Sequence, residues 1–374
     1  MTDGHLRMTY EEYRARKYLP ELDGIRGLSV LLVVSVHVKD RAFISLAGYL
    51  GVVLFFILSG YLITTLALRE EEDRGRVSLK AFYIRRSFRI FPLYYVVLGM
   101  YCLLILGMGF KADQRDVFID VLPAYFFYFQ EVPHSSHPLA SVPFDQSWSL
   151  GIEEKFYLVW PFLAFVLLAG TRYLRTGTAL LLVLLFACTP LLNEFGLPIL
   201  AGCLFPYFDI LIGCLLAVLL HDRYWFACLS RLAKPNVAVG LLLGYLFVHL
   251  WTPFAYREVY AIAWQYLYVV VATLLIASVI LGGGPLPRWL RWKPLVYVGT
   301  ISYGIYLVHL FALFGAHRVA AYFPGSILQA AISLILGSAG AIAIAAILAY
   351  LVERPCIRIG RRLAARVMDQ PTIR

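Results

Sequence analysis

Long runs of apolar residues recur along the chain, and short polar or charged stretches separate them. A helix needs roughly 17–25 mostly apolar residues to cross a bilayer core of about 30 Å, and most of the runs meet that length. The pattern therefore predicts an all-α, polytopic membrane protein. We expect about ten transmembrane helices, at 22–38, 47–68, 92–108, 148–169, 178–194, 204–220, 236–251, 262–281, 295–316 and 327–351.

A further apolar and aromatic stretch, 117–130, is too short for a usual span, and Asp120 and Pro123 interrupt it. Cytoplasmic loops of membrane proteins carry an excess of Lys and Arg. We interpret 117–130 as a re-entrant or interfacial segment, because this choice places the arginine-rich loops on one side of the membrane. With a cytoplasmic N-terminus, the inner segments are 69–91, 170–177, 221–235, 282–294 and the C-terminal tail.

This topology divides the chain into a cytoplasmic tail at 1–20, a membrane domain at 21–353 and a basic cytoplasmic tail at 354–374. The first twenty residues lack the apolar core of a cleavable signal peptide. After residue 351 little chain remains for a soluble extracytoplasmic domain. We therefore expect a multi-pass protein with both termini cytoplasmic.

Composition supports the membrane assignment and disfavours other classes. The 374 residues are 61% hydrophobic and 15% charged, whereas soluble domains are about 45–50% apolar and about 25% charged. The net charge of +10 is concentrated in loops, where it sets membrane orientation, so we expect membrane lipids and no nucleic acid as partners. Six scattered cysteines show no metal-binding spacing, which predicts no metal site.

The first predicted helix carries an arginine at its mouth and a histidine deep along it. Arg26 and His37 are eleven residues apart, which is about 16 Å and about three helical turns, so they share one face. Arg26 could be a membrane anchor and His37 a buried hydrogen-bond partner between helices. Their common face and the depth of His37 favour a catalytic site, with the imidazole as general base.

Two adjacent carboxylates, Glu153 and Glu154, lie near the start of another apolar run. Neighbours on a helix point about 100° apart, so we expect one to face the interior and the other to face Lys155 or solvent. Glu153 lies about 8 Å in from the predicted outer surface, near the expected depth of His37. We therefore expect Glu153 to orient the imidazole or stabilise its charge.

A basic segment, Arg85-Arg86-Ser-Phe-Arg89, precedes Pro92 at the predicted cytoplasmic face. One interpretation is an interfacial helix that binds anionic lipid headgroups. The other is a phosphate clamp, because Arg86 and Arg89 share a helix face and guanidinium groups bind phosphate through paired hydrogen bonds.

The ordered set of motifs between about residues 20 and 356 resembles the integral-membrane acyltransferase-3 family. The motifs are Leu22-Asp23-Gly-Ile-Arg26-Gly with His37, Phe55-Phe-Ile-Leu-Ser59-Gly60-Tyr61, Arg85-Arg86-Ser-Phe-Arg89-Ile-Phe-Pro92, Trp148-Ser149-Leu with Glu153-Glu154, Ile301-Ser302-Tyr303-Gly-Ile-Tyr306-Leu-Val-His309, and Glu353-Arg354-Pro355.

The resemblance implies an enzyme of the bacterial inner (cytoplasmic) membrane that O-acylates sugar-containing acceptors such as surface glycans. It implies acyl-CoA, with acetyl-CoA first, as donor substrate and no permanently bound cofactor. Some members carry an additional soluble domain, so direct transfer and transfer through a separate partner both stay open. The implied catalytic residues are Arg26, His37 and Glu153. Arg86 and Arg89 match the implied acyl-CoA-binding motif, and the adjacent Arg85 is included with them as a candidate acyl-CoA-binding residue.

Other polar residues in the predicted spans are candidates for substrate binding or, alternatively, for hydrogen bonds between helices. They are Tyr61, Trp148, Ser149, Glu154, Tyr303, Tyr306 and His309. Ser59-Gly60 is expected to permit close helix approach rather than to supply a catalytic serine, and Asp209 is a buried acid without an assigned role. His134 and His137 are expected to face solvent, in a loop that shapes acceptor access.

The sequence thus predicts a membrane-bound O-acyltransferase. It would move an acyl group, acetyl first, from cytosolic acyl-CoA to a hydroxyl of a glycan or lipid-linked sugar on the extracytoplasmic side. The alternative is a transporter of glycan precursors or anions, in which the buried charges form a substrate pathway. We find no two corresponding halves with broken helices, which counts against a transporter, and a non-catalytic scaffold would not explain the ordered buried charges.

Overall fold

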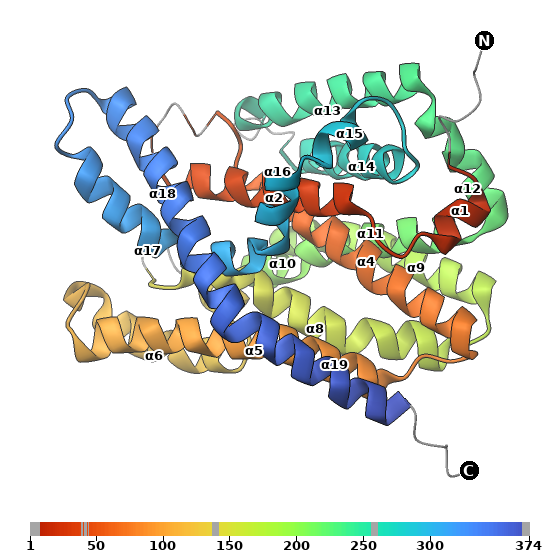
Figure 1. Cartoon of the computed structure of the whole chain (residues 1–374), viewed down its shortest axis with the longest axis horizontal. Helices are drawn as coiled ribbons and strands as arrows, with labels where there is room; N and C mark the ends of the chain where they lie inside the picture. The colour runs from red at the N-terminus through yellow and green to blue at the C-terminus, as the bar shows by residue number, and fades with distance from the viewer. Residues whose placement is uncertain are drawn as a thin grey trace.

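A computed structural model describes residues 8–38, 40, 43, 45–136, 142–255 and 261–368, and this part of the chain is helical without a strand (Figure 1). The α-helices are α1 (Tyr10–Ala15), α2 (Pro20–Val36), α4 (Leu50–Arg74), α5 (Leu79–Cys102), α6 (Arg115–Phe126), α7 (Glu131–Ser136), α8 (Trp148–Phe162), α9 (Arg172–Ala187), α10 (Pro198–Leu204), α11 (Pro206–His221), α12 (Arg223–Leu229), α13 (Pro235–Ala255), α14 (Ala261–Ile280), α15 (Leu286–Leu290), α16 (Lys293–Thr300), α17 (Ser302–Ala320), α18 (Ser326–Leu348) and α19 (Arg354–Met368). Short 3-10 and π turns are η1 (Leu103–Gly107), η2 (Ala112–Gln114), η3 (Asp145–Ser147), η4 (Leu163–Leu167), η5 (Thr189–Phe195), η6 (Ser230–Ala233) and η7 (Ala349–Glu353).

The all-α prediction is confirmed, but the count of about ten spans is not. In the described residues, seven helices are long and apolar enough to cross a membrane, or eight if α16 and α17 form one bent span. Helices α2 and α8 also coincide with predicted spans, yet they contain only 17 and 15 residues. Helix α6 has 12 residues, so the stretch 117–130 holds no helix of spanning length.

The segment predicted as a single helix over 295–316 is broken. Helices α16 and α17 meet at Ile301 with a bend of 82°. Just before the break, Gly299 packs on the backbone of α2 so closely that an added Cβ would lie 1.8 Å from the Asp23 carbonyl oxygen. Helix α16 thus crosses α2 at close range, and α17 then turns along α2. Hydropathy carries no information about this contact.

The predicted C-terminal tail is also helical. Helix α18 continues through η7 into α19, so one helical stretch runs over Ser326–Met368. Helix α19 packs along α5, where an added Cβ on Gly360 would lie 2.5 Å from the Cβ of Phe88. The ends of α19 and α1 lie on the right in Figure 1, and α6 lies on the left. Residues 369–374 lie outside the described part of the chain.

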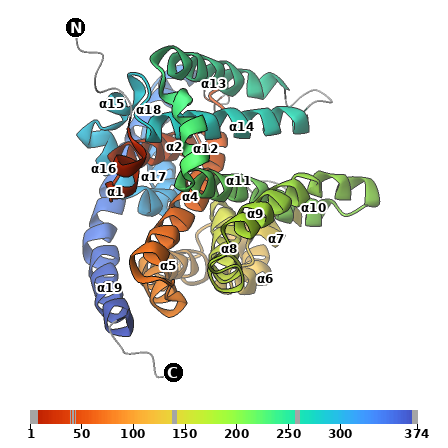
Figure 2. The same ribbon diagram turned by 90° about the vertical axis from the view of Figure 1, so that its right-hand side faces the viewer.

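The middle of the molecule is formed by α2, α4, α11 and α17 (Figure 2). Helices α4 and α11 pack through reciprocal glycines: an added Cβ on Gly60 would lie 1.9 Å from the Ile210 oxygen, and one on Gly213 would lie 2.1 Å from the Ile57 oxygen. Small residues let two helix backbones approach closely in a membrane. The close approach predicted for Ser59-Gly60 is therefore confirmed.

This contact predicts a large stability difference between two glycine substitutions. Gly60→Ala forces α4 and α11 apart, because the obstructing atom is backbone, and it should cost about 3 kcal/mol. Gly240→Ala on α13 is the matched control, since an added Cβ there has no neighbour within 4 Å and alanine favours a helix. We expect a lower yield and unfolding temperature in detergent for Gly60→Ala alone. Equal unfolding temperatures would contradict the tight α4–α11 contact.

Candidate functional site

A cavity of about 530 Å³ opens among α2, α4, α5, α8, α17 and α19. Its lining is strongly cationic, with three carboxylates among the positive charges. The cationic residues are Lys17, Arg26, Arg69, Arg86, Arg89, Arg354 and Arg361, and the carboxylates are Asp23, Glu153 and Glu353. Such an excess of positive charge suits a ligand with several negative charges, such as phosphates.

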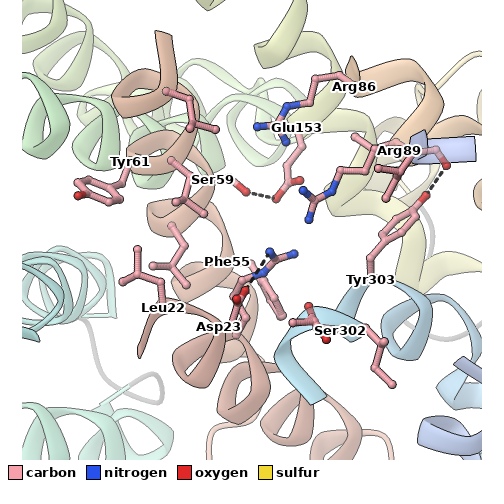
Figure 3. Close-up of a pocket in the computed structure, with 18 of the residues that line it drawn as sticks. Leu22, Asp23, Phe55, Ser59, Tyr61, Arg86, Arg89, Glu153, Ser302 and Tyr303 are labelled. Atoms are coloured by element: carbon pink, nitrogen blue, oxygen red, sulfur yellow. Dashed lines mark hydrogen bonds and ion pairs between the residues drawn. The ribbon is translucent and has the colours of Figure 1, made fainter. Parts of the chain in front are cut away.

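Helix α5 aims two arginines into this cavity and a third away from it. Arg86 and Arg89 line the cavity from one face of the helix (Figure 3), as their i, i+3 spacing predicts. The Arg86 guanidinium lies 5.1 Å from the Tyr157 ring centroid. Arg85 lies outside the lining and forms a 2.8 Å ion pair with Glu70. Because consecutive helix residues diverge by about 100°, we remove Arg85 from the candidate acyl-CoA site.

Arg26 enters the same cavity from the first turns of α2. Its guanidinium lies 3.8 Å from Asp23, and the Tyr18 hydroxyl donates a hydrogen bond to that carboxylate at 2.7 Å. Arg89 and Glu153 also act electrostatically on Arg26. Three helices, α2, α5 and α8, therefore bring Arg26, the two α5 arginines and Glu153 together.

Glu153 is held by hydroxyl groups. The Ser59 hydroxyl donates to one carboxylate oxygen at 3.0 Å (Figure 3). The Tyr157 hydroxyl donates to the other oxygen at 2.9 Å. The hydrogen bonds of Glu153 thus run to hydroxyls and not to the His37 imidazole, so the described contacts do not support its predicted role of orienting that imidazole. Helix α8 begins directly after two buried polar residues, Gln146 and Ser147.

Glu154, a predicted substrate-binding residue, lies outside the cavity lining. Lys155, its predicted partner, pairs with Glu131 at 2.9 Å. Glu131 is the first residue of α7, so a contact between α7 and α8 supplies the partner of the lysine.

His37 lies at the end of α2, as its C-cap residue, and contacts a second histidine. Its Nδ1 atom is 2.8 Å from the Val33 carbonyl oxygen and 3.3 Å from Nε2 of His309. The two imidazole rings are 4.7 Å apart at an angle of 67°. His309 is fully buried and lies outside the cavity lining, so this arrangement does not support its predicted role in binding substrate.

Two tyrosines of α17 connect the cavity with this histidine pair. Tyr303 and Tyr306 both line the cavity. The Tyr303 hydroxyl donates to the Ile90 oxygen at 2.9 Å (Figure 3). The Tyr306 hydroxyl hydrogen-bonds with Ser149 at 2.8 Å, and His309 follows one turn later on α17. The cavity therefore ends next to the turn of α17 that carries His309.

The remaining predicted substrate residues occupy different places. Tyr61 lines the cavity but is buried, and its hydroxyl lies 3.3 Å from that of Tyr13. Trp148 lies outside the lining and stacks on His134, with ring centroids 4.8 Å apart and an interplanar angle of 6°. His134 does not simply face solvent, because its Nδ1 lies 2.9 Å from Asp145. His137 lies outside the described residues.

Comparison with known proteins fits this arrangement of motifs. A sequence model described as the acyltransferase domain matches residues 19–350. The chain belongs to the acyltransferase-3 family. No solved structure matches the chain.

Three longer bacterial proteins are similar in sequence to this acyltransferase-3 chain. It is 31% identical over 321 residues to the peptidoglycan O-acetyltransferase OatA of Listeria monocytogenes, an alignment covering 79% of this chain and 49% of OatA. It is 29% identical over 325 residues to YrhL of Bacillus subtilis, a putative peptidoglycan O-acetyltransferase, covering 80% and 49%. A putative O-acetyltransferase of Staphylococcus aureus is 29% identical over 259 residues, covering 67% and 37%. The chain spans half the length or less of these relatives.

Several cavity residues of this acyltransferase-3 chain were missed in the sequence. Lys17, Arg69, Arg354 and Arg361 complete the cationic lining, and Glu353 adds a buried carboxylate. A signal for the four cations did exist, because all of them lie in segments predicted to be cytoplasmic. From the sequence, we interpret these four charges only as determinants of topology and give a binding role to the α5 arginines alone, although the other loop charges also indicate where an anionic ligand would enter.

Proposed function

We propose that this acyltransferase-3 chain is an O-acetyltransferase of the bacterial inner membrane. It would take an acetyl group from acyl-CoA on the cytosolic side and transfer it to a hydroxyl of a sugar-containing acceptor on the extracytoplasmic side. Two of these relatives are named for peptidoglycan O-acetylation, which makes peptidoglycan the first acceptor to test. The main support is one cavity in which Arg26, Arg86 and Arg89, from separate motifs, converge.

The donor end of the proposed site is this cationic cavity. Coenzyme A carries phosphates, and each charge-assisted hydrogen bond between a guanidinium and phosphate contributes about 1.5–3 kcal/mol. Arg86 is preorganised by its contacts with Tyr157 and Phe82. The first turn of α17, which also lines the cavity, presents backbone N–H groups, and a helix N-terminus favours anions.

Helix α2 sets the distance over which the acyl group must travel. Arg26 lies in the cavity, and His37 lies eleven residues further along the same helix, a rise of about 16 Å. This interval is comparable to the reach of an extended pantetheine arm. A thioester entering beside Arg26 would pass Tyr306 and Ser149 and arrive near His37.

His37 is the proposed general base. Its imidazole accepts the proton of the acceptor hydroxyl while the hydroxyl oxygen attacks the thioester carbonyl carbon. A C–O ester bond forms, the C–S bond breaks, and the CoA thiolate leaves with the bonding electron pair. The imidazolium then returns the proton to that thiolate, so the enzyme is regenerated as acetyl ester and free CoA are released.

Glu153 receives a different role from the one that its sequence position suggested. It is bound by Ser59 and Tyr157 and interacts electrostatically with Arg26 and Arg86. We assign it to holding the two arginines in place at the cavity. It is a positioning residue for the donor site and acts on His37 only through the placement of the thioester.

Labelled acetyl-CoA separates the enzyme from the alternative transporter. Membrane vesicles with the cytosolic face outward receive radiolabelled acetyl-CoA outside and peptidoglycan fragments inside. We expect acetyl ester on the fragments, identified by mass spectrometry and removed by mild base. Label that enters without covalent attachment would instead support a transporter, for which the bent α16–α17 pair would be the structural argument. Absence of both products, with folded protein present, would contradict the proposed function.

A further inference from the structure

The His37–His309 pair carries a role that the proposed function does not yet include. We infer that His309 is a positioning residue that fixes the tautomer and orientation of the His37 imidazole. The inference rests on the proposed function, in which His37 is the general base. It replaces the contact with substrate that the sequence suggested for His309.

The tautomer of His309 follows from its hydrogen bonds. Its Nδ1 atom is 2.7 Å from the Tyr306 carbonyl oxygen. A carbonyl oxygen can only accept, so Nδ1 carries the proton, and in a neutral imidazole Nε2 then holds the lone pair. Full burial of the ring disfavours a second proton, because an additional charge would have to be desolvated. His309 therefore presents an acceptor nitrogen to its neighbour.

The tautomer of His37 follows in turn. Its Nδ1 atom faces two acceptors, the Val33 carbonyl oxygen at 2.8 Å and Nε2 of His309 at 3.3 Å. Both contacts need a proton on Nδ1 of His37. In the neutral ring, Nε2 of His37 then holds the lone pair, so this nitrogen is the base. The angle of 67° between the rings lets the edge of His37 point at the nitrogen of His309.

The pair resembles the base and its orienting group in a Ser-His-Asp triad, with a neutral imidazole in place of the aspartate. When Nε2 of His37 takes the acceptor proton, the imidazolium keeps its Nδ1–H directed at the two acceptors. They stabilise the new charge and hold the ring in place. Helix α17 carries both His309 and Tyr306, so the group that orients the base is fixed to the cavity wall.

A matched set of variants separates orientation of the base from structural support. His309→Ala removes the acceptor nitrogen, whereas His309→Gln can place an amide oxygen near that position. His317→Gln is the control: His317 lies two turns further along α17, and its Nε2 is 3.2 Å from the Val38 oxygen. His317 thus contacts the same end of α2 as His309 does, but it is not part of the His37–His309 pair.

Acetyl transfer by detergent-solubilised full-length protein gives the first readout. We expect His309→Ala to lower kcat about 100-fold with the KM for acetyl-CoA changed less than about twofold. The kcat of His309→Gln should be at least about tenfold higher than that of His309→Ala, and His317→Gln should keep the wild-type kcat. Wild-type kcat in folded His309→Ala would overturn the inference. If folded His309→Gln had a kcat as low as that of folded His309→Ala, the inference would also be overturned.

Nitrogen-15 NMR of histidine-labelled protein tests the tautomer without using activity. Protonated and lone-pair nitrogens give separate signals, and His37→Ala identifies the signals of His37. We expect a proton on Nδ1 of His37 in the wild type. In His309→Ala only the Val33 oxygen still accepts from Nδ1, so we expect a larger share of the tautomer protonated on Nε2. A proton on Nε2 of wild-type His37 would overturn the inference. If the wild type transfers no acetyl group, the proposed function fails while this tautomer test still gives its own result.

Discussion

Replacing Arg86 or Arg89 by alanine is expected to raise the KM for acetyl-CoA by about 10- to 100-fold. Each change removes a guanidinium from the cationic cavity, and a charge-assisted hydrogen bond to phosphate is worth about 1.5–3 kcal/mol. The effect on kcat should be smaller, because both residues lie at the donor end, away from the His37–His309 pair. Initial rates of acetyl transfer against acetyl-CoA concentration provide the measurement.

Arg85→Ala is the matched control, since Arg85 is adjacent in the same helix but lies outside the cavity and pairs with Glu70. Removing this half-exposed ion pair should cost less than about 1 kcal/mol and leave the KM unchanged. Raising the salt concentration should weaken acetyl-CoA binding by wild type more than by Arg86→Ala, because one fewer charge attracts the ligand. An equal rise in KM for Arg85→Ala would indicate a general surface effect and contradict the assigned site.

Hydropathy was sufficient to predict helices in all ten apolar segments, because burial of backbone polar groups in lipid forces a helical conformation. It could not predict how those helices end or bend. The break at Ile301 depends on the contact of Gly299 with the Asp23 backbone, and an apolar run looks the same whether it is straight or bent.

Spacing within a helix allowed part of the site to be predicted. The i, i+3 spacing of Arg86 and Arg89 places them on one face, and the same geometry should have excluded Arg85. Contacts between helices were beyond this reasoning. His37 and His309 are 272 residues apart, and Ser59 and Glu153 are 94 residues apart, so no local pattern connects them. The resemblance to the family identified Glu153 and His37, but only the packing of α2, α4, α8 and α17 shows that they contact different partners.

Replacing His37 by alanine is expected to lower the rate of acetyl transfer at least about 1,000-fold, because it removes the proposed general base. Acetyl-CoA should still bind, since the cavity lining does not include this residue. Equilibrium dialysis with labelled acetyl-CoA measures that binding, and acetyl release to the acceptor measures the chemistry.

The informative comparison for this variant is His317→Ala, which removes an imidazole of α17 that contacts the Val38 oxygen just after the end of α2. It should fold and transfer acetyl groups at close to the wild-type rate. Loss of transfer in both variants would mean that packing between α2 and α17, rather than proton transfer, is what His37 supplies. Retained transfer in folded His37→Ala would remove His37 from the mechanism. If transfer is lost in His37→Ala alone and acetyl-CoA still binds, the donor site on α5 is separate from a base at the far end of α2. A reaction between substrates from opposite sides of a membrane requires such a separation.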